Sequence, residues 1–191
     1  MKIIATHGGI TVGGDGASHQ ATEDIALMRA LPNMTVIVPC DAPETVSVVN
    51  KVVDIHSPMY IRLNRPKVPT ITDKDYEFHL GKASIFRDGA DITLIGTGIM
   101  VSRCLLAAEI LAKKGVDARV INMSTVKPID EDIILKCAKE TNGIITAEDH
   151  SIIGGLGSAV AEVLIERKPV HMKRIGIRDT FGESGNYDEL M

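Results

Sequence analysis

The chain has 191 residues, of which 45% are hydrophobic and 24% charged, with a formal net charge of -4 at pH 7. This balance excludes disordered, collagen-like and low-complexity proteins, and it gives no sign of the basic face that nucleic acid binding needs. No segment approaches the roughly 18 apolar residues of a membrane helix, and no signal-peptide core is visible. Three widely spaced cysteines, Cys40, Cys104 and Cys137, favour reduced thiols over disulfides or a zinc site. We therefore expect a cytoplasmic globular protein whose partners include neither nucleic acid nor membrane.

Short runs rich in Ile, Val and Thr alternate along the chain with longer segments of three-to-four apolar spacing. The expected strands are Lys2–Thr6, Met34–Val38, Met59–Leu63, Asp91–Gly96, Ala118–Asn122, Gly143–Ala147 and Lys173–Ile177. The expected helices are Thr22–Leu31, Pro43–Ile55, Ser102–Lys114, Asp130–Lys139 and Leu156–Arg167. This alternation predicts α/β architecture, with mostly parallel sheets that carry helices on both faces.

The alternation is interrupted once, at Asn64–Asp75, where two prolines and five charges occur without a sustained period. Such a segment is typical of a linker between two units. We therefore expect two three-layer units, residues 1–75 and residues 76–191. The first unit is incomplete, because three strands in about 70 residues are few for a doubly wound layer.

The segment His7–His19 follows an expected strand and contains five glycines, two histidines and one aspartate. Ligands bind beyond the carboxyl ends of parallel strands, and glycine permits close backbone approach there. Imidazoles and a carboxylate can bind hydroxyls or phosphate and move protons. The alternative is a loop that only turns, with Asp15 or Ser18 capping the next helix. A metal site at His7, Asp15 and His19 is not supported, because their spacing is not that of a known site.

The residues from Thr6 to Gln20, followed by Glu23-Asp24 and Met28–Met34, resemble the thiamine-diphosphate enzyme transketolase in the later part of its pyrimidine-binding domain. Further stretches that carry the resemblance are Val38–Asp41, Tyr60–Arg65, Gly96–Gly98, Lys127–Asp130, Glu148–His150, Gly154–Ser158 and Phe181–Gly185. The resemblance covers essentially the whole chain, and its second half is similar to the transketolase C-terminal domain. This domain order is shared by two related families, 1-deoxyxylulose-5-phosphate synthase and the β subunits of 2-oxo-acid dehydrogenases. The sequence GASHQATED, however, is closer to transketolase than to either of them.

The resemblance implies a substrate-binding role for His7, Asp15, His19 and Arg65, which would contact a sugar phosphate of the pentose phosphate type. Arg65 and His7 suit the phosphate, and Asp15 suits a hydroxyl. His19 would be the catalytic residue, because it can donate to a developing alkoxide. Glycine stands at position 14 and at positions 8 and 9, where the family carries longer side chains, so the preferred sugar stays open.

The resemblance also implies thiamine diphosphate and Mg²⁺ as cofactors of the complete enzyme. The activating glutamate and the GDG…N motif of the diphosphate and Mg²⁺ site have no counterpart in this chain, since Gly14-Asp15-Gly16 belongs to the substrate loop. We therefore expect a section of a transferase that is inactive alone, truncated at both ends. It would pair with an N-terminal transketolase section or subunit in a homodimer or a heterotetramer.

Other interpretations stay open at this stage. The chain could be a non-catalytic interaction module of the same family, or a nucleotide-binding α/β protein that uses its glycine-rich loops. The latter lacks an acidic residue at the end of the second strand. Gly154–Gly157 could bind an anion at a helix N-terminus, although packing is favoured there. Glu148–His150 is expected to be a polar strand-end cluster at a subunit interface.

Overall fold

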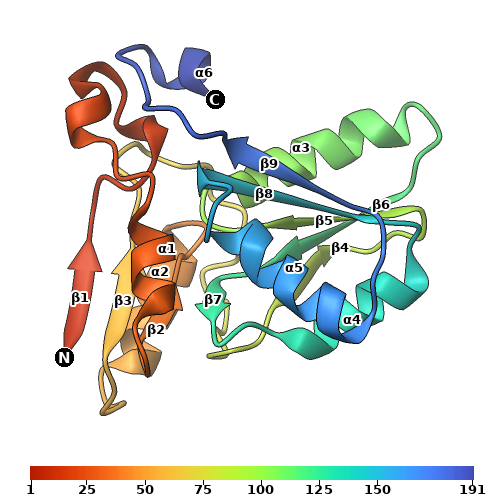
Figure 1. Cartoon of the computed structure of the whole chain (residues 1–191), viewed down its shortest axis with the longest axis horizontal. Helices are drawn as coiled ribbons and strands as arrows, with labels where there is room; N and C mark the ends of the chain where they lie inside the picture. The colour runs from red at the N-terminus through yellow and green to blue at the C-terminus, as the bar shows by residue number, and fades with distance from the viewer.

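A computed structural model describes all 191 residues, and its strands form two separate sheets (Figure 1). The first sheet has the order β1 (Lys2–Ala5), β3 (Met59–Arg62), β2 (Thr35–Ile37), β7 (Thr125–Lys127). Its first three strands are parallel, and β7 runs antiparallel to β2. Two 3₁₀ helices, η1 (Ile10–Asp15) and η2 (Ala17–His19), follow β1, and this sheet is packed with α1 (Asp24–Ala30) and α2 (Ala42–Val52).

The second sheet has the order β4 (Ser84–Arg87), β6 (Ala118–Asn122), β5 (Ile92–Gly96), β8 (Ile144–Ser151), β9 (Met172–Ile177). All its pairs are parallel except β4 with β6. Helix α3 (Met100–Ala112) covers one face, while α4 (Glu131–Glu140) and α5 (Leu156–Arg167) cover the other, and a short α6 (Tyr187–Leu190) ends the chain. The expected α/β class, with two mostly parallel sheets and a small first one, is confirmed.

Alternating side chains of the first sheet explain why it needs helices on both sides. Val36 lies in the apolar cluster that contains Ile25 of α1, whereas its neighbour Ile37 lies in the cluster that contains Val48 of α2. Successive strand residues point to opposite faces, so a strand buried on both sides is apolar throughout. The second sheet alternates in the same way, with clusters that contain Ile95, Ile121 and Ile144 on one face and Leu94, Val120 and Ala147 on the other.

Two strands were not expected from the sequence, and both are short antiparallel edges. β4 pairs with β6, and β7 pairs with β2 although β7 lies in the C-terminal half of the chain. Phe78 is also buried in the cluster of the first sheet. Residues from beyond the expected linker therefore contribute a strand and a core side chain to the first sheet, and the division of the chain at residue 75 stays a prediction.

The expected linker is held against α2 by Asp41, the N-cap residue of that helix. The Asp41 carboxylate accepts hydrogen bonds from the backbone N of Glu44 at 3.0 Å and from the backbone N of Ile71 and Thr72 at 2.8 and 2.7 Å. A side-chain oxygen at the N-cap satisfies amides that the helix leaves unpaired, and here the same carboxylate also fixes the linker. Among the helices, none combines the length and apolar character needed to cross a membrane.

Candidate functional site

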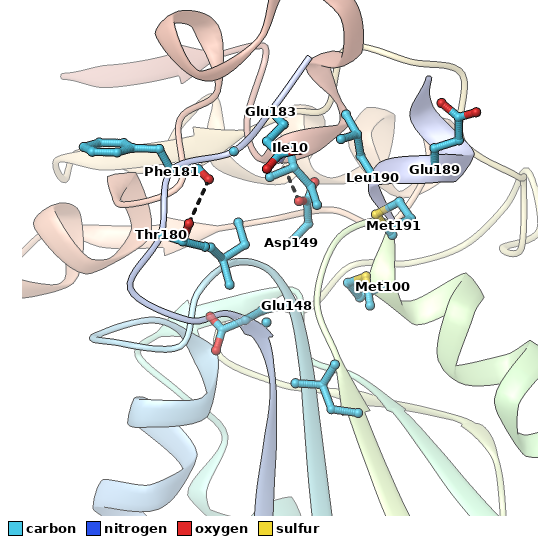
Figure 2. Close-up of a pocket in the computed structure, with 14 residues that line it drawn as sticks. Ile10, Met100, Glu148, Asp149, Thr180, Phe181, Glu183, Glu189, Leu190 and Met191 are labelled. Atoms are coloured by element: carbon cyan, nitrogen blue, oxygen red, sulfur yellow. Dashed lines mark hydrogen bonds between the residues drawn. The ribbon is translucent and has the colours of Figure 1, made fainter. Parts of the chain in front are cut away.

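The candidate site lies where the carboxyl ends of several strands meet. β1 leads into the glycine-rich segment and β3 leads into Asn64 and Arg65. The two strands are parallel neighbours, and the Gly8 amide donates to the Leu63 carbonyl at 3.1 Å. From the second sheet, the end of β8 brings Asp149 beneath the same segment (Figure 2). The parallel pairing thus places segments far apart in sequence at one sheet edge, as expected for an α/β ligand site.

Arg65 and Asp15 form the best-defined pair of the four predicted site residues. Nη1 of Arg65 donates to Oδ2 of Asp15 and to the Val12 carbonyl, the latter at 3.0 Å. Both side chains stay open to solvent, with exposed fractions of 45% and 43%. Neither Nη2 nor Nε of Arg65 has a hydrogen-bond partner in the chain. The guanidinium is therefore anchored through one nitrogen, and Arg65 lines a hollow of about 410 Å³ that Gly13 and Tyr187 also line.

His7 and His19 lie on the same segment but do not join this pair. Nδ1 of His7 lies 2.8 Å from Oγ1 of Thr6, and Nδ1 of His19 lies 3.0 Å from Oγ of Ser18. Both histidines are exposed, no hydrogen bond connects either one to Asp15 or Arg65, and neither lines the 410 Å³ hollow. Each ring keeps Nε2 free, and where the hydroxyl donates to Nδ1 the neutral ring carries its proton on Nε2. The structure thus brings two of the four residues together and holds the other two in matching local arrangements, so their substrate roles stay predictions.

His7 has a backbone φ of 66°, which is uncommon for a residue other than glycine. Such conformations persist only where the surrounding structure holds them, and they cluster at ligand sites. Here the following residue, Gly8, is tied to Leu63 and packs on Arg62, since a Cβ at Gly8 would lie 2.6 Å from Nε of Arg62. The entry to the glycine-rich segment is therefore fixed by its neighbours.

Arg62 is a buried residue of the site that the sequence analysis did not single out. Its exposed fraction is 2%, and Nε donates to both carboxylate oxygens of Asp24, at 3.2 and 2.9 Å. Nη2 donates to the carbonyls of Ala21 and Asp149 at 3.1 and 2.7 Å. Arg62 thereby connects β3, the start of α1 and the end of β8. A charged residue in an otherwise apolar four-residue strand is the signal that could have found it.

Asp149 is the second buried residue that the sequence analysis did not assign to the site. Its exposed fraction is 4%, and burial raises the pKa of its carboxyl above the ordinary value, although Arg62 and the hydrogen bonds oppose that shift. Oδ1 accepts from the Ile10 amide at 2.9 Å, and Oδ2 accepts from Oγ1 of Thr11 at 3.2 Å. Nδ2 of Asn64 also donates to Oδ2, at 3.4 Å. A residue of the C-terminal half thus holds the beginning of η1.

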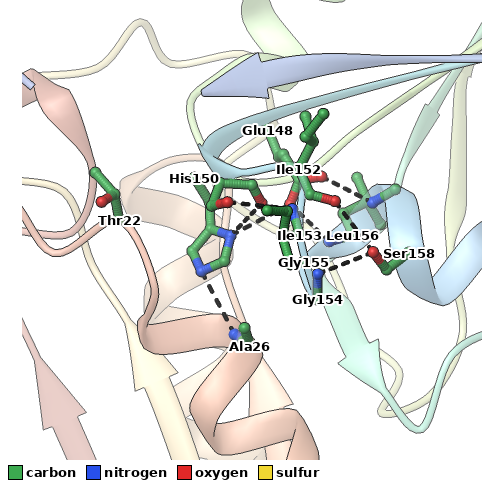
Figure 3. A network of polar contacts seen from close by, with 12 residues as sticks. Thr22, Ala26, Glu148, His150, Ile152, Ile153, Gly154, Gly155, Leu156 and Ser158 are labelled. Carbon is green, nitrogen blue, oxygen red and sulfur yellow. Dashed lines mark hydrogen bonds and ion pairs between the residues drawn. The ribbon is translucent and has the colours of Figure 1, made fainter. Parts of the chain in front are cut away.

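The neighbouring Glu148 occupies the N-terminus of α5 (Figure 3). Its carboxylate accepts from the backbone N of Leu156 at 2.6 Å and of Gly157 at 2.8 Å. A Cβ at Gly155 would lie 1.9 Å from Oε2 of Glu148, which explains the glycine. Because the helix amides already bind this carboxylate, the packing interpretation of Gly154–Gly157 holds and an anion site at that position is excluded.

His150 lies inside the chain and not at a subunit surface. It is fully buried, its Nδ1 lies 2.6 Å from the Ser151 carbonyl, and its Nε2 accepts from the Ala26 amide at 3.4 Å (Figure 3). The cluster at Glu148–His150 therefore joins the two halves of the chain. The expectation that it belongs to a subunit interface was wrong, because α1 packs over it.

The end of the chain after β9 passes over the glycine-rich segment. Nε2 of Gln20 donates to the carbonyls of Ile10 and Glu183 at 3.1 and 3.0 Å. Arg103 of α3 holds α6 through Asp188 at 3.1 Å and lies over the Tyr187 ring at 5.5 Å. A cavity of about 400 Å³ opens between this end and the edges of β8 and β9 (Figure 2).

The residues of this chain do not provide a metal centre. No group of three or more His, Cys, Asp or Glu side chains is close enough to hold an ion. The carboxylates at the site already have partners in the chain: Asp15 pairs with Arg65, Asp24 pairs with Arg62, and Asp149 accepts from the Ile10 amide and the Thr11 hydroxyl. The Mg²⁺ that the family resemblance implies does not fit these side chains.

Comparisons with known proteins agree with this architecture. Residues 1–70 match the family described as transketolase, pyrimidine binding domain, and residues 81–191 match transketolase, C-terminal domain. The chain is 45% identical to the 6-deoxy-6-sulfo-D-fructose transketolase subunit of Clostridium sp. strain MSTE9, covering 100% of this chain and 59% of that protein. It is 43% identical to a subunit of the apulose-4-phosphate transketolase of Phocaeicola vulgatus, covering 100% of this chain and 61% of that protein.

A solved structure described as a split gene transketolase, inactive beta4 tetramer, superposes with a TM-score of 0.87 at 47% identity. The match covers 93% of this chain and 57% of that chain. The chain thus spans about three fifths of the length of the relatives that it matches. The two family models match both halves of the sequence, and the superposed structure has the same fold. The chain therefore belongs to the transketolase family.

Proposed function

We propose that this chain supplies substrate-binding side chains to a transketolase-type transferase, which moves a two-carbon ketol unit between anionic sugars. The observation that carries the proposal is the Arg65–Asp15 pair at the carboxyl end of β1 and β3, with two guanidinium nitrogens left free. The family assignment supports the reaction type. The chain alone is expected to be inactive.

Arg65 suits the anionic end of the sugar. A planar guanidinium edge binds a tetrahedral oxyanion through two parallel N–H donors, and Nη2 with Nε forms such an edge here. The two relatives are named for apulose 4-phosphate and for 6-deoxy-6-sulfo-D-fructose, sugars that end in a phosphate and a sulfonate. The same edge of Arg65 can bind either group, so we propose an anionic ketose as the substrate class.

His19, His7 and Asp15 complete the proposed roles. Nε2 of His19 would donate to the oxygen on which charge develops as the carbon–carbon bond breaks, and His7 would bind the anion beside Arg65. Asp15 would accept from a sugar hydroxyl on binding, which requires it to share its carboxylate with Arg65. Gly14, where an added Cβ would meet no atom within 4 Å, leaves room for the sugar at the loop surface.

Thiamine diphosphate, when bound, supplies the carbanion chemistry of this family. We propose that the cofactor and Mg²⁺ are held by an N-terminal transketolase section or subunit, in a dimer or heterotetramer of the cytoplasm. The resemblance of the first half to a pyrimidine-binding domain and the names of the split relatives support this arrangement.

A second candidate is a non-catalytic module that assembles with itself. The solved relative described as an inactive beta4 tetramer favours it. The two candidates differ in one respect: an enzyme section gains activity when its partner is added, whereas an interaction module binds a partner without gaining activity.

The test is reconstitution with an N-terminal section, a pyrimidine-domain segment that carries the activating glutamate, thiamine diphosphate and Mg²⁺. Xylulose 5-phosphate serves as donor and ribose 5-phosphate as acceptor. Apulose 4-phosphate and 6-deoxy-6-sulfofructose serve as alternative donors. We expect transfer with at least one of the three donors. A partner that demonstrably binds without any transfer would favour the interaction module.

Two variants then test the site. His19→Ala should lower kcat by about 10²-fold without lowering Tm, while the exposed His56→Ala, outside the loop, serves as its control. Arg65→Met should raise KM for a phosphorylated ketose much more than for the same sugar without phosphate. Equal effects on both sugars would remove Arg65 from anion binding, and an unchanged rate in His19→Ala would remove His19 from the mechanism.

A further inference from the structure

We infer that Asp149, from the C-terminal half of the chain, is a positioning residue for the substrate loop, because it sets the start of η1 and the segment that carries Arg65. The inference rests on the proposed function of that loop. It assigns to the C-terminal half a part in substrate binding through Asp149, whose carboxylate touches the loop and not the sugar.

Helix η1 has no side-chain cap of its own. Its N-cap residue is Gly9, which has no side chain to accept from the first amides. Asp149 takes that place, since Oδ1 accepts from the Ile10 amide at 2.9 Å and Oδ2 from Oγ1 of Thr11 at 3.2 Å. A carboxylate at the first helix amides is the ordinary stabilising partner of a helix start. Here it comes from a strand of the other sheet.

The Asp149 carboxylate also packs closely on the loop. Gly9 has a φ of 80°, and a Cβ there would lie 2.0 Å from Oδ2 of Asp149. Only glycine combines this backbone conformation with such a close approach. Asp149 and Gly9 therefore determine each other's position, and the loop cannot slide along β8 without losing these contacts.

Asp149 contacts both segments that carry the exposed ion pair. η1 begins at Ile10 and, after a kink at Gly13, ends at Asp15, which binds Arg65. On the other side, Nδ2 of Asn64, the residue before Arg65, donates to Oδ2 of Asp149 at 3.4 Å. Loss of the carboxylate would loosen both sides at once, and the geometry of Asp15 and Arg65 would spread over several conformations.

The experiment compares Asp149→Ala, Asp149→Asn, Thr11→Val and a matched control, Asp130→Ala. Asp130 is likewise buried and acidic and lies in the C-terminal half, where it caps α4 and accepts from the Ala83 amide at 3.0 Å. Asp130 makes no contact with the loop, so its loss should lower Tm without changing substrate binding. Thr11→Val removes one hydroxyl from the Asp149 contacts and should leave the fold intact.

Two readouts apply, amide hydrogen exchange in the full chain and steady-state kinetics of the assembled enzyme with its active donor. In Asp149→Ala we expect exchange at residues 10–15 to be at least about tenfold faster, with exchange in β5 unchanged. We also expect KM for the donor to rise by about tenfold or more, with kcat within about threefold. Asp149→Asn should restore both within about threefold, because its oxygen still accepts from the Ile10 amide and its NH₂ can donate to Oγ1 of Thr11, so that only the 3.4 Å contact with Asn64 is lost. Thr11→Val should fall between wild type and Asp149→Ala.

Unchanged exchange at residues 10–15 in Asp149→Ala would overturn the inference, as would an equal rise in KM in Asp130→Ala. The two proposals can fail separately. An assembly inactive with every donor would refute the proposed function, while hydrogen exchange in the chain alone still decides whether Asp149 holds the loop.

Discussion

Arg62 offers the sharpest test of how this chain holds its site together. It is 2% exposed and donates to Asp24 twice and to the carbonyls of Ala21 and Asp149. Arg62→Met keeps similar volume but leaves the largely buried Asp24 carboxylate with Tyr60 as its remaining side-chain hydrogen-bond donor, through the 2.6 Å bond from the Tyr60 hydroxyl. Removing one partner of a buried ion pair costs about 3–5 kcal/mol, chiefly through the charge that is left uncompensated.

That cost can be converted into a shift in melting temperature. A chain of 191 residues has an unfolding entropy of about 0.4 kcal/mol/K near its midpoint. We therefore expect Arg62→Met to lower Tm by about 8–12 °C, measured by circular dichroism. Urea denaturation should show a matching decrease in the free energy of unfolding. The control is Arg167→Met, which breaks the exposed pair with Glu131, whose two side chains are 56% and 52% exposed. Its expected cost is below about 1 kcal/mol.

The double variant Arg62→Met/Asp24→Asn separates charge from packing. If the uncompensated carboxylate causes most of the loss, neutralising Asp24 should recover about half of it, since the two carbonyl acceptors stay without Arg62. A double variant as unstable as the sum of the two single variants would refute this reasoning. So would a cost of Arg62→Met no larger than that of Arg167→Met.

Three further predictions follow from buried groups. Glu148→Ala leaves the amides of Leu156 and Gly157 without acceptors and should lower the free energy of unfolding by about 3 kcal/mol, whereas Glu148→Gln should lose less; urea denaturation measures both. Because burial raises the pKa of Asp149, the folded chain binds this proton more tightly than the unfolded chain, so its contribution to stability falls as pH rises from near 3.8 through the raised pKa. The stability of Asp149→Asn relative to wild type should therefore increase over that range, and a constant difference in urea titrations at several pH values would contradict the assignment. Burial raises the pKa of Cys104 to about 12, so iodoacetamide at pH 8 should modify it only after unfolding, as read by mass spectrometry.

The elements with a strong local pattern were predictable. Helix α2 has Pro43 in its first turn and Asp41 as its cap, so its start at Ala42 lies one residue from the expected one. The strands around Ile37 and Ile95 are short apolar runs bounded by polar residues, and both occur where the sequence predicts them. Short antiparallel edges such as β4 and β7 carry too few residues for a period to be recognised.

The site was predictable in part, for a related reason. The composition of residues 7–19 indicates a ligand loop, because glycines and titratable groups after a strand are a local property. That Asp15 meets Arg65 depends on β3 pairing with β1 instead of β2 alone, which is a choice between sheet orders. His7 and His19 stay outside the pair because of the path that the backbone takes through the five glycines. Glycine permits many backbone conformations, so the local sequence does not specify this path.

By itself, the sequence determined the α/β class, most helices and strands and the family, and it predicts the segment that carries the candidate site. Tertiary structure alone decided that β7 completes the first sheet, that Glu148 closes the start of α5, and that Arg62 and Asp149 tie the two halves together beneath the loop. The physical reason is that a helix or strand that buries one face carries apolar residues at a regular spacing, which can be recognised in the sequence. A buried charge, by contrast, needs a partner from a distant segment, and packing between the two sheets selects which one.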